Sequence, residues 1–178
     1  MIDYVSIKST LDLLEQEYNT ALNNNNTDQQ MPILYSKLAI LELCGWIEVS
    51  IDNVLYEYVN NNVSKEENKK IIKERINGNY GFKFKSNLQP LFCSVFGIKN
   101  YETIIGALSD QELANMQTTL GNLAKLRDIA AHNNTEVGIT PTYNAPSQTI
   151  TDYKKIKPAF EIIEKEIQKL YSNTTNPA

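Results

Sequence analysis

The sequence predicts an all-α protein, an up-and-down helical bundle with additional short helices. Three observations favour this fold class. Apolar residues recur every three or four positions along most of the chain, as they do on one face of an α-helix. Two Ser-x-x-Glu segments have the spacing of a helix capping box. One short stretch alternates aromatic and basic residues like a strand, but no partner strand is visible for it.

The length of 178 residues suits one well-cored domain and is short for two, so residues 1–178 are predicted to form a single domain. The first ten residues are polar, and no stretch has the roughly twenty apolar residues of a membrane span. Cys44 and Cys93 lie among apolar residues at helical spacing, which is typical of buried thiols. We therefore expect a soluble, cytoplasmic protein that does not contact a membrane.

The first helix is expected from Asp3 to about Leu22, and an Asn-rich loop follows it. A long second helix is predicted from Met31 to about Val59, with an apolar arc wide enough for a central position in the bundle. The apolar stripe of the first helix consists of Val5, Leu11, Leu14, Tyr18 and Leu22. The second helix carries one stripe of Leu34, Leu38, Leu41, Gly45 and Leu55, and an adjoining one of Ile40, Cys44, Ile47, Ile51, Val54 and Tyr58.

Two acidic residues, Glu48 and Asp52, interrupt the first of these stripes one helical turn apart. They lie beside Gly45, where a neighbouring backbone has room to approach. A polar seam is the favoured interpretation of the pair, with a supporting role at a functional site as the alternative.

Short elements fill the middle of the chain. A charged helix is predicted from a capping box at Ser64 to about Ile76, and apolar helices at residues 88–96 and 101–108. Between them, residues 79–85 interleave aromatic side chains with lysines. A solvated surface is favoured for this stretch, although such interleaving is also the composition of RNA-binding platforms. The candidate RNA-binding lysines are Lys83, Lys85 and Lys125.

A second capping box, Ser109 to Glu112, opens the helix that carries Arg127 and His132, the only histidine of the chain. Arg127 takes a position where an apolar side chain is expected. A guanidinium there is costly unless an anion meets it, either a carboxylate of this chain or a phosphate from outside. The stripe consists of Leu113, Met116, Leu120, Leu123, Ala124, Arg127 and Ala131.

Leu126 and Ile129 lie on the opposite side of this helix, so that its last turns are apolar nearly all round. A helix buried on two sides has two neighbours, and we expect these to be the core of the chain and a second subunit. In a regular helix Arg127 and His132 point roughly 140° apart. Either the helix deforms at its end, or the two side chains meet across a subunit boundary.

A long polar loop is predicted after His132, and a last helix from Thr151 or Pro158 to Tyr171. The buried face of that helix is expected to consist of Phe160, Ile163, Ile167 and Leu170.

Composition argues against several classes of function. A net charge of −4 argues against a protein that binds nucleic acids nonspecifically, because such proteins are usually basic overall. One histidine leaves no second imidazole for a zinc site, and no glycine-rich phosphate loop occurs. We therefore predict neither a metal nor a cofactor.

The segment from Leu126 to His132 resembles the HEPN superfamily, the higher eukaryotes and prokaryotes nucleotide-binding domains. Many members carry an Arg, four to six further residues and a His, with a polar residue directly after the Arg. Arg127, Asp128 and His132 match this pattern. The resemblance covers the helix layout of most of the chain, while its sequence-specific part is confined to about seven residues.

The resemblance implies a metal-independent endoribonuclease of a toxin–antitoxin or phage-defence system, which acts on RNA as a homodimer and has an antitoxin or defence-system partner protein. It implies Arg127 and His132 as catalytic residues. The supporting residues would be Asp128, Asn133, Glu48 and Asp52. The alternative function is a non-catalytic HEPN-like module that binds a nucleotide or a partner protein.

Metal-free RNA cleavage needs a base, an acid and a cation. One chain offers a single imidazole, and a twofold dimer supplies a second. The structural alternatives remain open: Arg127 forms an ion pair with Glu48, Asp52 or Asp128, and His132 satisfies the last carbonyls of its helix.

Overall fold

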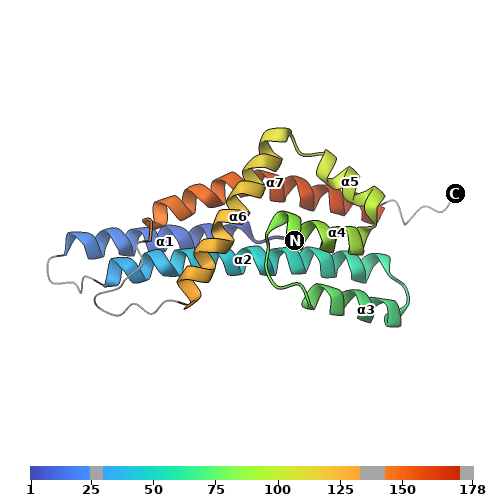
Figure 1. Ribbon diagram of the computed structural model, residues 1–178, viewed down its shortest axis with the longest axis horizontal. Helices are drawn as coiled ribbons and strands as arrows, with labels where there is room; N and C mark the ends of the chain where they lie inside the picture. The colour runs from blue at the N-terminus through green and yellow to red at the C-terminus, as the bar shows by residue number, and fades with distance from the viewer. Residues whose placement is uncertain (25–29, 133–142, 173–178) are drawn as a thin grey trace. The chain divides into compact units, whose positions relative to one another are not determined.

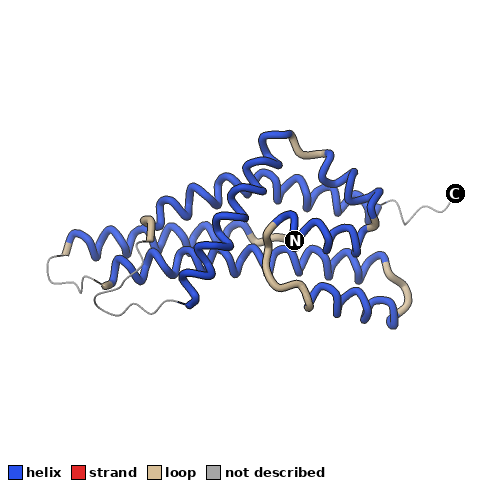
Figure 2. Tube along the Cα trace, viewed as in Figure 1, coloured by secondary structure: helices blue, strands red, loops and turns tan. Residues whose placement is uncertain are grey.

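The computed structural model describes residues 1–24, 30–132 and 143–172. Within these ranges the chain forms helices and no strand, which confirms the all-α class (Figures 1 and 2). None of the helices described combines the length and the hydropathy that a membrane-spanning segment needs. The elements are α1 (Tyr4–Asn23), α2 (Met31–Asn62), α3 (Glu66–Asn77), the π-helix η1 (Phe84–Leu88), α4 (Gln89–Phe96), α5 (Ile98–Gly106), α6 (Asp110–His132) and α7 (Pro146–Ser172).

The helices are grouped into two compact units. Unit 1 comprises Met1–Ile2, Glu48–Gly121 and Lys155–Ala178. Unit 2 comprises Asp3–Ile47 and Asn122–Lys154. The helices α2, α6 and α7 each contribute a segment to both units.

In unit 2, Trp46 of α2 contacts both the start of α1 and α7. Its indole Nε1–H donates a hydrogen bond to the Asp3 carbonyl oxygen at 2.9 Å. Its ring packs edge-on against Tyr4 and Tyr153, with ring centroids 5.8 and 5.6 Å away. The Tyr153 hydroxyl in turn donates to the Tyr4 carbonyl oxygen at 3.1 Å. These contacts join the start of α1 to α2 and α7.

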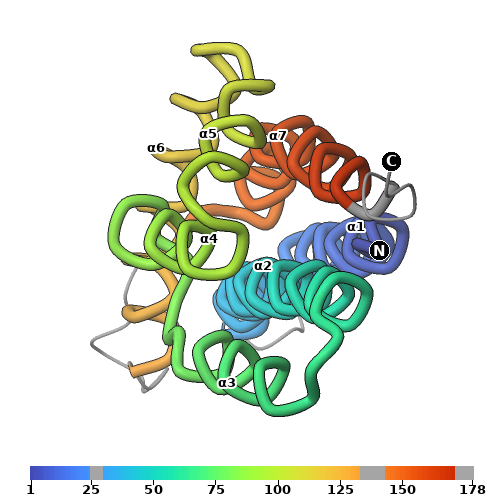
Figure 3. The backbone as a smooth tube through the Cα atoms, turned by 90° about the vertical axis from the view of Figure 1, so that its right-hand side faces the viewer, coloured from blue at the N-terminus to red at the C-terminus, as the bar shows by residue number. Residues whose placement is uncertain are grey.

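Unit 1 places the second part of α2 between α3 on one side and α4 and α7 on the other (Figures 1 and 3). The Tyr56 hydroxyl of α2 donates a hydrogen bond to the Asn77 side chain at the end of α3. Tyr58 packs edge-on against Phe96 of α4, with ring centroids 4.6 Å apart. A small apolar cavity of about 20 Å³ lies in this core, lined among others by Ile2 and Met116.

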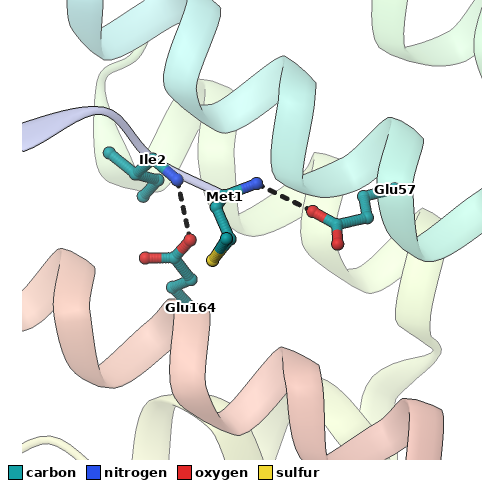
Figure 4. A network of polar contacts seen from close by, with 4 residues as sticks. All are labelled: Met1, Ile2, Glu57 and Glu164. Atoms are coloured by element: carbon teal, nitrogen blue, oxygen red, sulfur yellow. Dashed lines mark hydrogen bonds and ion pairs between the residues drawn. The ribbon is translucent and has the colours of Figure 1, made fainter.

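The first two residues lie between α2 and α7 of unit 1 (Figure 4). The Ile2 backbone N–H donates to the Glu164 carboxylate at 2.7 Å. The Met1 amine forms an ion pair with Glu57 at 2.8 Å. The same segment leads directly into the cap of α1, because the Asp3 carboxylate accepts hydrogen bonds from the backbone N–H groups of the first turn.

The buried faces of α1 and α2 differ in part from the predicted stripes. In α1 the buried residues are Ile7, Leu11 and Leu14. Val5 is 76% exposed, which shows that the stripe is displaced at its start. In α2 the adjoining stripe through Cys44 and Ile47 is buried as predicted. The first stripe is buried as predicted only at Leu55. Leu34 and Leu38 are exposed, and so is Gly45, where a Cβ would meet nothing within 4 Å.

The two predicted capping boxes have opposite outcomes. Ser109 and Glu112 form the predicted box: the Ser109 N–H donates to the Glu112 carboxylate at 2.8 Å, and the Glu112 N–H donates to the Ser109 Oγ at 3.3 Å. The box predicted at Ser64 is wrong. The extended cap residue of α3 is Lys65, and no side chain caps this end, because the helix begins one residue later than the pattern required.

The last helix is longer than predicted. It begins at Pro146, where the fixed φ of proline suits a first helical turn. Pro158 lies inside α7 with its ring on the exposed side and neither begins nor ends the helix. The predicted loop therefore ends before residue 146, and its residues 133–142 lie outside the described ranges.

Candidate functional site

Arg127 lies on the buried face of α6, as the sequence predicts. It is half-buried, and its neighbours one turn before and three residues after, Leu123 and Ala130, are fully buried. The stripe continues through Ala130, not through Ala131 as expected, because Ala131 is exposed. The thiol of Cys44 in α2 donates to the Leu123 carbonyl oxygen at 3.7 Å. α6 is therefore held against α2 one turn before the arginine.

His132 lies on a different face of the same helix. It is the last residue of α6 and is exposed. The helix stays regular to this residue, so the first of the two sequence-based alternatives, a deformed helix end, does not occur. Five residues along a regular helix correspond to a rotation of roughly 140° and a rise of about 7.5 Å. On α6 of one chain the Cα–Cβ bonds of Arg127 and His132 therefore point in divergent directions.

The residues around this pair are largely solvent-facing. Lys125 and Asp128 are exposed, and Asn133 lies outside the described residues. Leu126 is half-buried, and Ile129 is 41% exposed. The end of α6 therefore presents an apolar side chain to solvent beside the Arg and His positions.

Glu48 and Asp52 belong to unit 1, whereas Arg127 and His132 belong to unit 2. Both carboxylates are half-buried on α2. Burial, and to a lesser degree the charge of Glu48, raise the pKa of the Asp52 carboxyl. Burial and the charge of Asp52 raise the pKa of the Tyr56 hydroxyl one turn further on. The ion pair of Arg127 with either carboxylate stays a prediction.

In the stretch of alternating lysines and aromatic residues, the two phenylalanines are buried and the two lysines are exposed. Phe82 and Phe84 are 1% and 5% exposed and belong to the core of unit 1. Lys83 and Lys85 between them are exposed. Tyr80 departs from this alternation, because it is 88% exposed. The alternating pattern alone does not distinguish Tyr80 from the two phenylalanines, although Gly78 and Gly81 around it were the available signal.

Among the residues that the structure describes, no three His, Cys, Asp or Glu side chains are grouped as a metal site requires. Comparison with protein-family models, with curated proteins and with solved structures gave no match. Membership of the HEPN superfamily therefore stays a prediction from the Arg127–His132 segment.

Proposed function

We propose that the protein is a metal-independent endoribonuclease of the HEPN type, whose cleavage site combines Arg127 of one copy with His132 of a second copy. The observation that carries the proposal is the regular end of α6. Arg127 and His132 occupy different sides of α6 in a single chain, and a twofold axis would bring Arg127 of one copy beside His132 of the other.

The two side chains suit complementary roles. The guanidinium of an arginine is a cation with a planar array of donors that matches phosphate oxygens. Histidine is the side chain that accepts and donates a proton near neutral pH. An exposed His132 at the end of a helix is accessible to a large substrate, and half-burial of Arg127 strengthens its interaction with an anion.

In the proposed reaction, these two side chains account for every proton that moves and for the charge that develops on the phosphate. The imidazole takes the proton of a ribose 2′-hydroxyl, and the 2′-oxygen attacks the adjacent phosphorus. The bond from phosphorus to the 5′-oxygen breaks, and the imidazolium returns its proton to that oxygen. The guanidinium stabilises the charge that develops on the phosphoryl oxygens. The products are a 2′,3′-cyclic phosphate and a free 5′-hydroxyl.

Exposed apolar side chains in unit 2 are a further argument for the proposed second copy. Ile129 on α6 and Leu34 and Leu38 on α2 are between 37% and 42% exposed. Gly45 continues the α2 stripe with open space above it. Burial of apolar side chains against an equivalent surface contributes about 25 cal/mol per Å². Because the proposed composite site is incomplete without a second copy, that copy is the partner we assign to Ile129, which lies beside the Arg127 position.

The test is incubation of purified protein with total RNA in EDTA, with analysis of the cleaved ends. We expect cleavage by the wild type and none by His132→Ala. Arg127→Lys keeps the positive charge and loses the two-pronged donor, so its cleavage should fall strongly while RNA binding largely persists. Binding of RNA or a nucleotide without cleavage by the wild type would point to the non-catalytic module instead.

A further inference from the structure

Tyr80 is exposed more than any other large hydrophobic side chain of the described ranges. Single exposed apolar residues are common on protein surfaces and call for no explanation by themselves. The loop that carries Tyr80 is different, because side-chain hydrogen bonds hold its backbone at Tyr80 and at the next residue.

Two asparagine side chains hold this loop. The Asn87 Nδ2 donates to the Tyr80 carbonyl oxygen at 3.1 Å, and the Asn79 Nδ2 donates to the Gly81 carbonyl oxygen at 3.0 Å. Gly81 has a φ of 111°, which favours glycine, and a Cβ there would meet the Asn87 amide at 3.6 Å. Phe82 is then buried. The ring of Tyr80 is therefore presented to solvent from an ordered loop whose conformational entropy has already been lost on folding.

Charge distinguishes the same region from the rest of the chain. Residues 75–101 contain no Asp or Glu, although the protein as a whole carries a net charge of −4. The basic residues of this stretch are all exposed: Arg75, Lys83, Lys85 and Lys99. An exposed aromatic ring flanked along the sequence by cations and by no carboxylate has a composition complementary to a polyanion with flat, unpaired bases.

We propose that Tyr80, Lys83 and Lys85 form a binding subsite for single-stranded RNA, in which one base stacks on the Tyr80 ring and the lysines contact the flanking phosphates. The inference rests on the proposed function, since it assigns a holding site for the RNA that the Arg127 and His132 site cleaves. Stacking tolerates any base, so the subsite binds unpaired RNA with little sequence preference.

The experiment measures fluorescence anisotropy of a labelled 2′-O-methyl oligoadenylate, which lacks the attacking hydroxyl and stays intact with active protein. Tyr80→Ala should weaken binding about 5- to 150-fold, the range for loss of one base–aromatic stack. Tyr80→Phe keeps the ring and should bind within about twofold of the wild type. Tyr80→Leu keeps an apolar side chain without a ring, and we expect it to weaken binding as Tyr80→Ala does.

The lysines and the loop are tested separately. In Lys83→Gln/Lys85→Gln the slope of log affinity against log salt should fall by about 1.4, or 0.7 for each phosphate contact to a single strand. The control Lys154→Gln/Lys165→Gln, which changes two exposed lysines of α7, should leave the slope unaltered. Asn87→Ala removes a support of the loop and should weaken binding several-fold although the ring remains.

If Tyr80→Ala bound the single strand as tightly as the wild type does, the subsite would be overturned. The same would follow if Tyr80→Ala lost affinity equally for duplex RNA, whose bases are not available for stacking. In either case cleavage by the wild type in EDTA would leave the proposed nuclease intact. Tyr80-dependent binding without any cleavage would support the subsite and reject the nuclease. Capture of polyglutamate through Tyr80, without RNA binding, would overturn the subsite in favour of an acidic protein partner.

Discussion

Glu48 and Asp52 lie one helical turn apart on α2, both half-buried, and the pKa of the Asp52 carboxyl is raised by burial and by its negative neighbour. Ionised Asp52 therefore destabilises the folded protein, whatever its role at a functional site. Carboxylates that have a raised pKa in a folded protein are frequent at functional sites, but polar seams between helices raise them too.

Asp52→Asn should increase the free energy of unfolding at pH 7, by less than about 1 kcal/mol because solvent screens a partly exposed carboxyl. A group whose pKa is raised on folding binds its proton more tightly in the folded state, so the unfavourable contribution is full above the raised pKa and disappears as the pH falls towards the ordinary value of 3.8. Urea unfolding between pH 4 and 7 measures it. Glu42→Gln, at an exposed position of the same helix, is the control.

Equal stability of Asp52→Asn and wild type at pH 7 and at pH 4 would contradict this account. A less stable Asp52→Asn at pH 7 would mean that the carboxylate has a favourable partner, as the predicted ion pair with Arg127 requires.

Mixing two inactive variants tests whether the cleavage site is shared between copies. A mixed dimer of Arg127→Ala and His132→Ala retains one composite site, formed by the intact Arg127 of one chain and the intact His132 of the other. Random exchange makes half of the dimers mixed, so activity should return to about a quarter of the wild-type rate. If Arg127 and His132 of one chain act together, the mixture stays inactive in the same assay.

Ile129→Glu places a charge on the proposed contact between copies and should convert dimers to monomers, because an unpaired charge in an apolar interface is costly. Light scattering at micromolar concentration gives the mass, and the RNA assay should show loss of cleavage in parallel. Ile71→Glu is the matched control, since Ile71 is 64% exposed on α3 of unit 1. A wild-type protein that is monomeric and still cleaves RNA would reject the shared site.

Ser109→Ala should lower the free energy of unfolding by about 1 kcal/mol, the usual loss when a helix N-cap is removed. The Ser109 hydroxyl accepts the Glu112 N–H and donates to the Glu112 carboxylate at 2.7 Å. Ser109→Thr keeps a capping oxygen and should lose much less. Ser64 also lies in a capping-box sequence, but it does not cap α3 in the structure. Ser64→Ala should therefore change the free energy of unfolding little, as measured by chemical denaturation.

Periodicity predicted most of the buried face of α6. In α1 it placed Leu11 and Leu14 correctly, but Val5 and Leu22 of the predicted stripe are exposed. It could not decide between the two stripes of α2, since spacing identifies apolar positions such as Leu38 but not which of them has a neighbour. The start of α7 was missed for a related reason: its first turns bury Thr149 and Tyr153 and carry no long apolar stripe.

The site was predicted in part. The place of Arg127 on the inner face of α6 followed from the sequence spacing, and the exposed His132 followed from the helix end. What the guanidinium meets depends on tertiary packing, which spacing along one helix does not contain. The exposure of Tyr80 was not predicted, because strict alternation groups it with Phe82 and Phe84, whereas Gly81 between them has a positive φ that interrupts the extended backbone.

The last helix, α7, contacts the N-terminal segment in both units. In unit 1 the backbone of Ile2 is bonded to Glu164, 162 residues later, and in unit 2 the Tyr153 hydroxyl is bonded to Tyr4. A nascent chain that emerges from the ribosome has its N-terminal segment long before it has α7. Neither unit can complete its core before α7 has been synthesised. Until then the N-terminal helices lack the contacts that α7 provides.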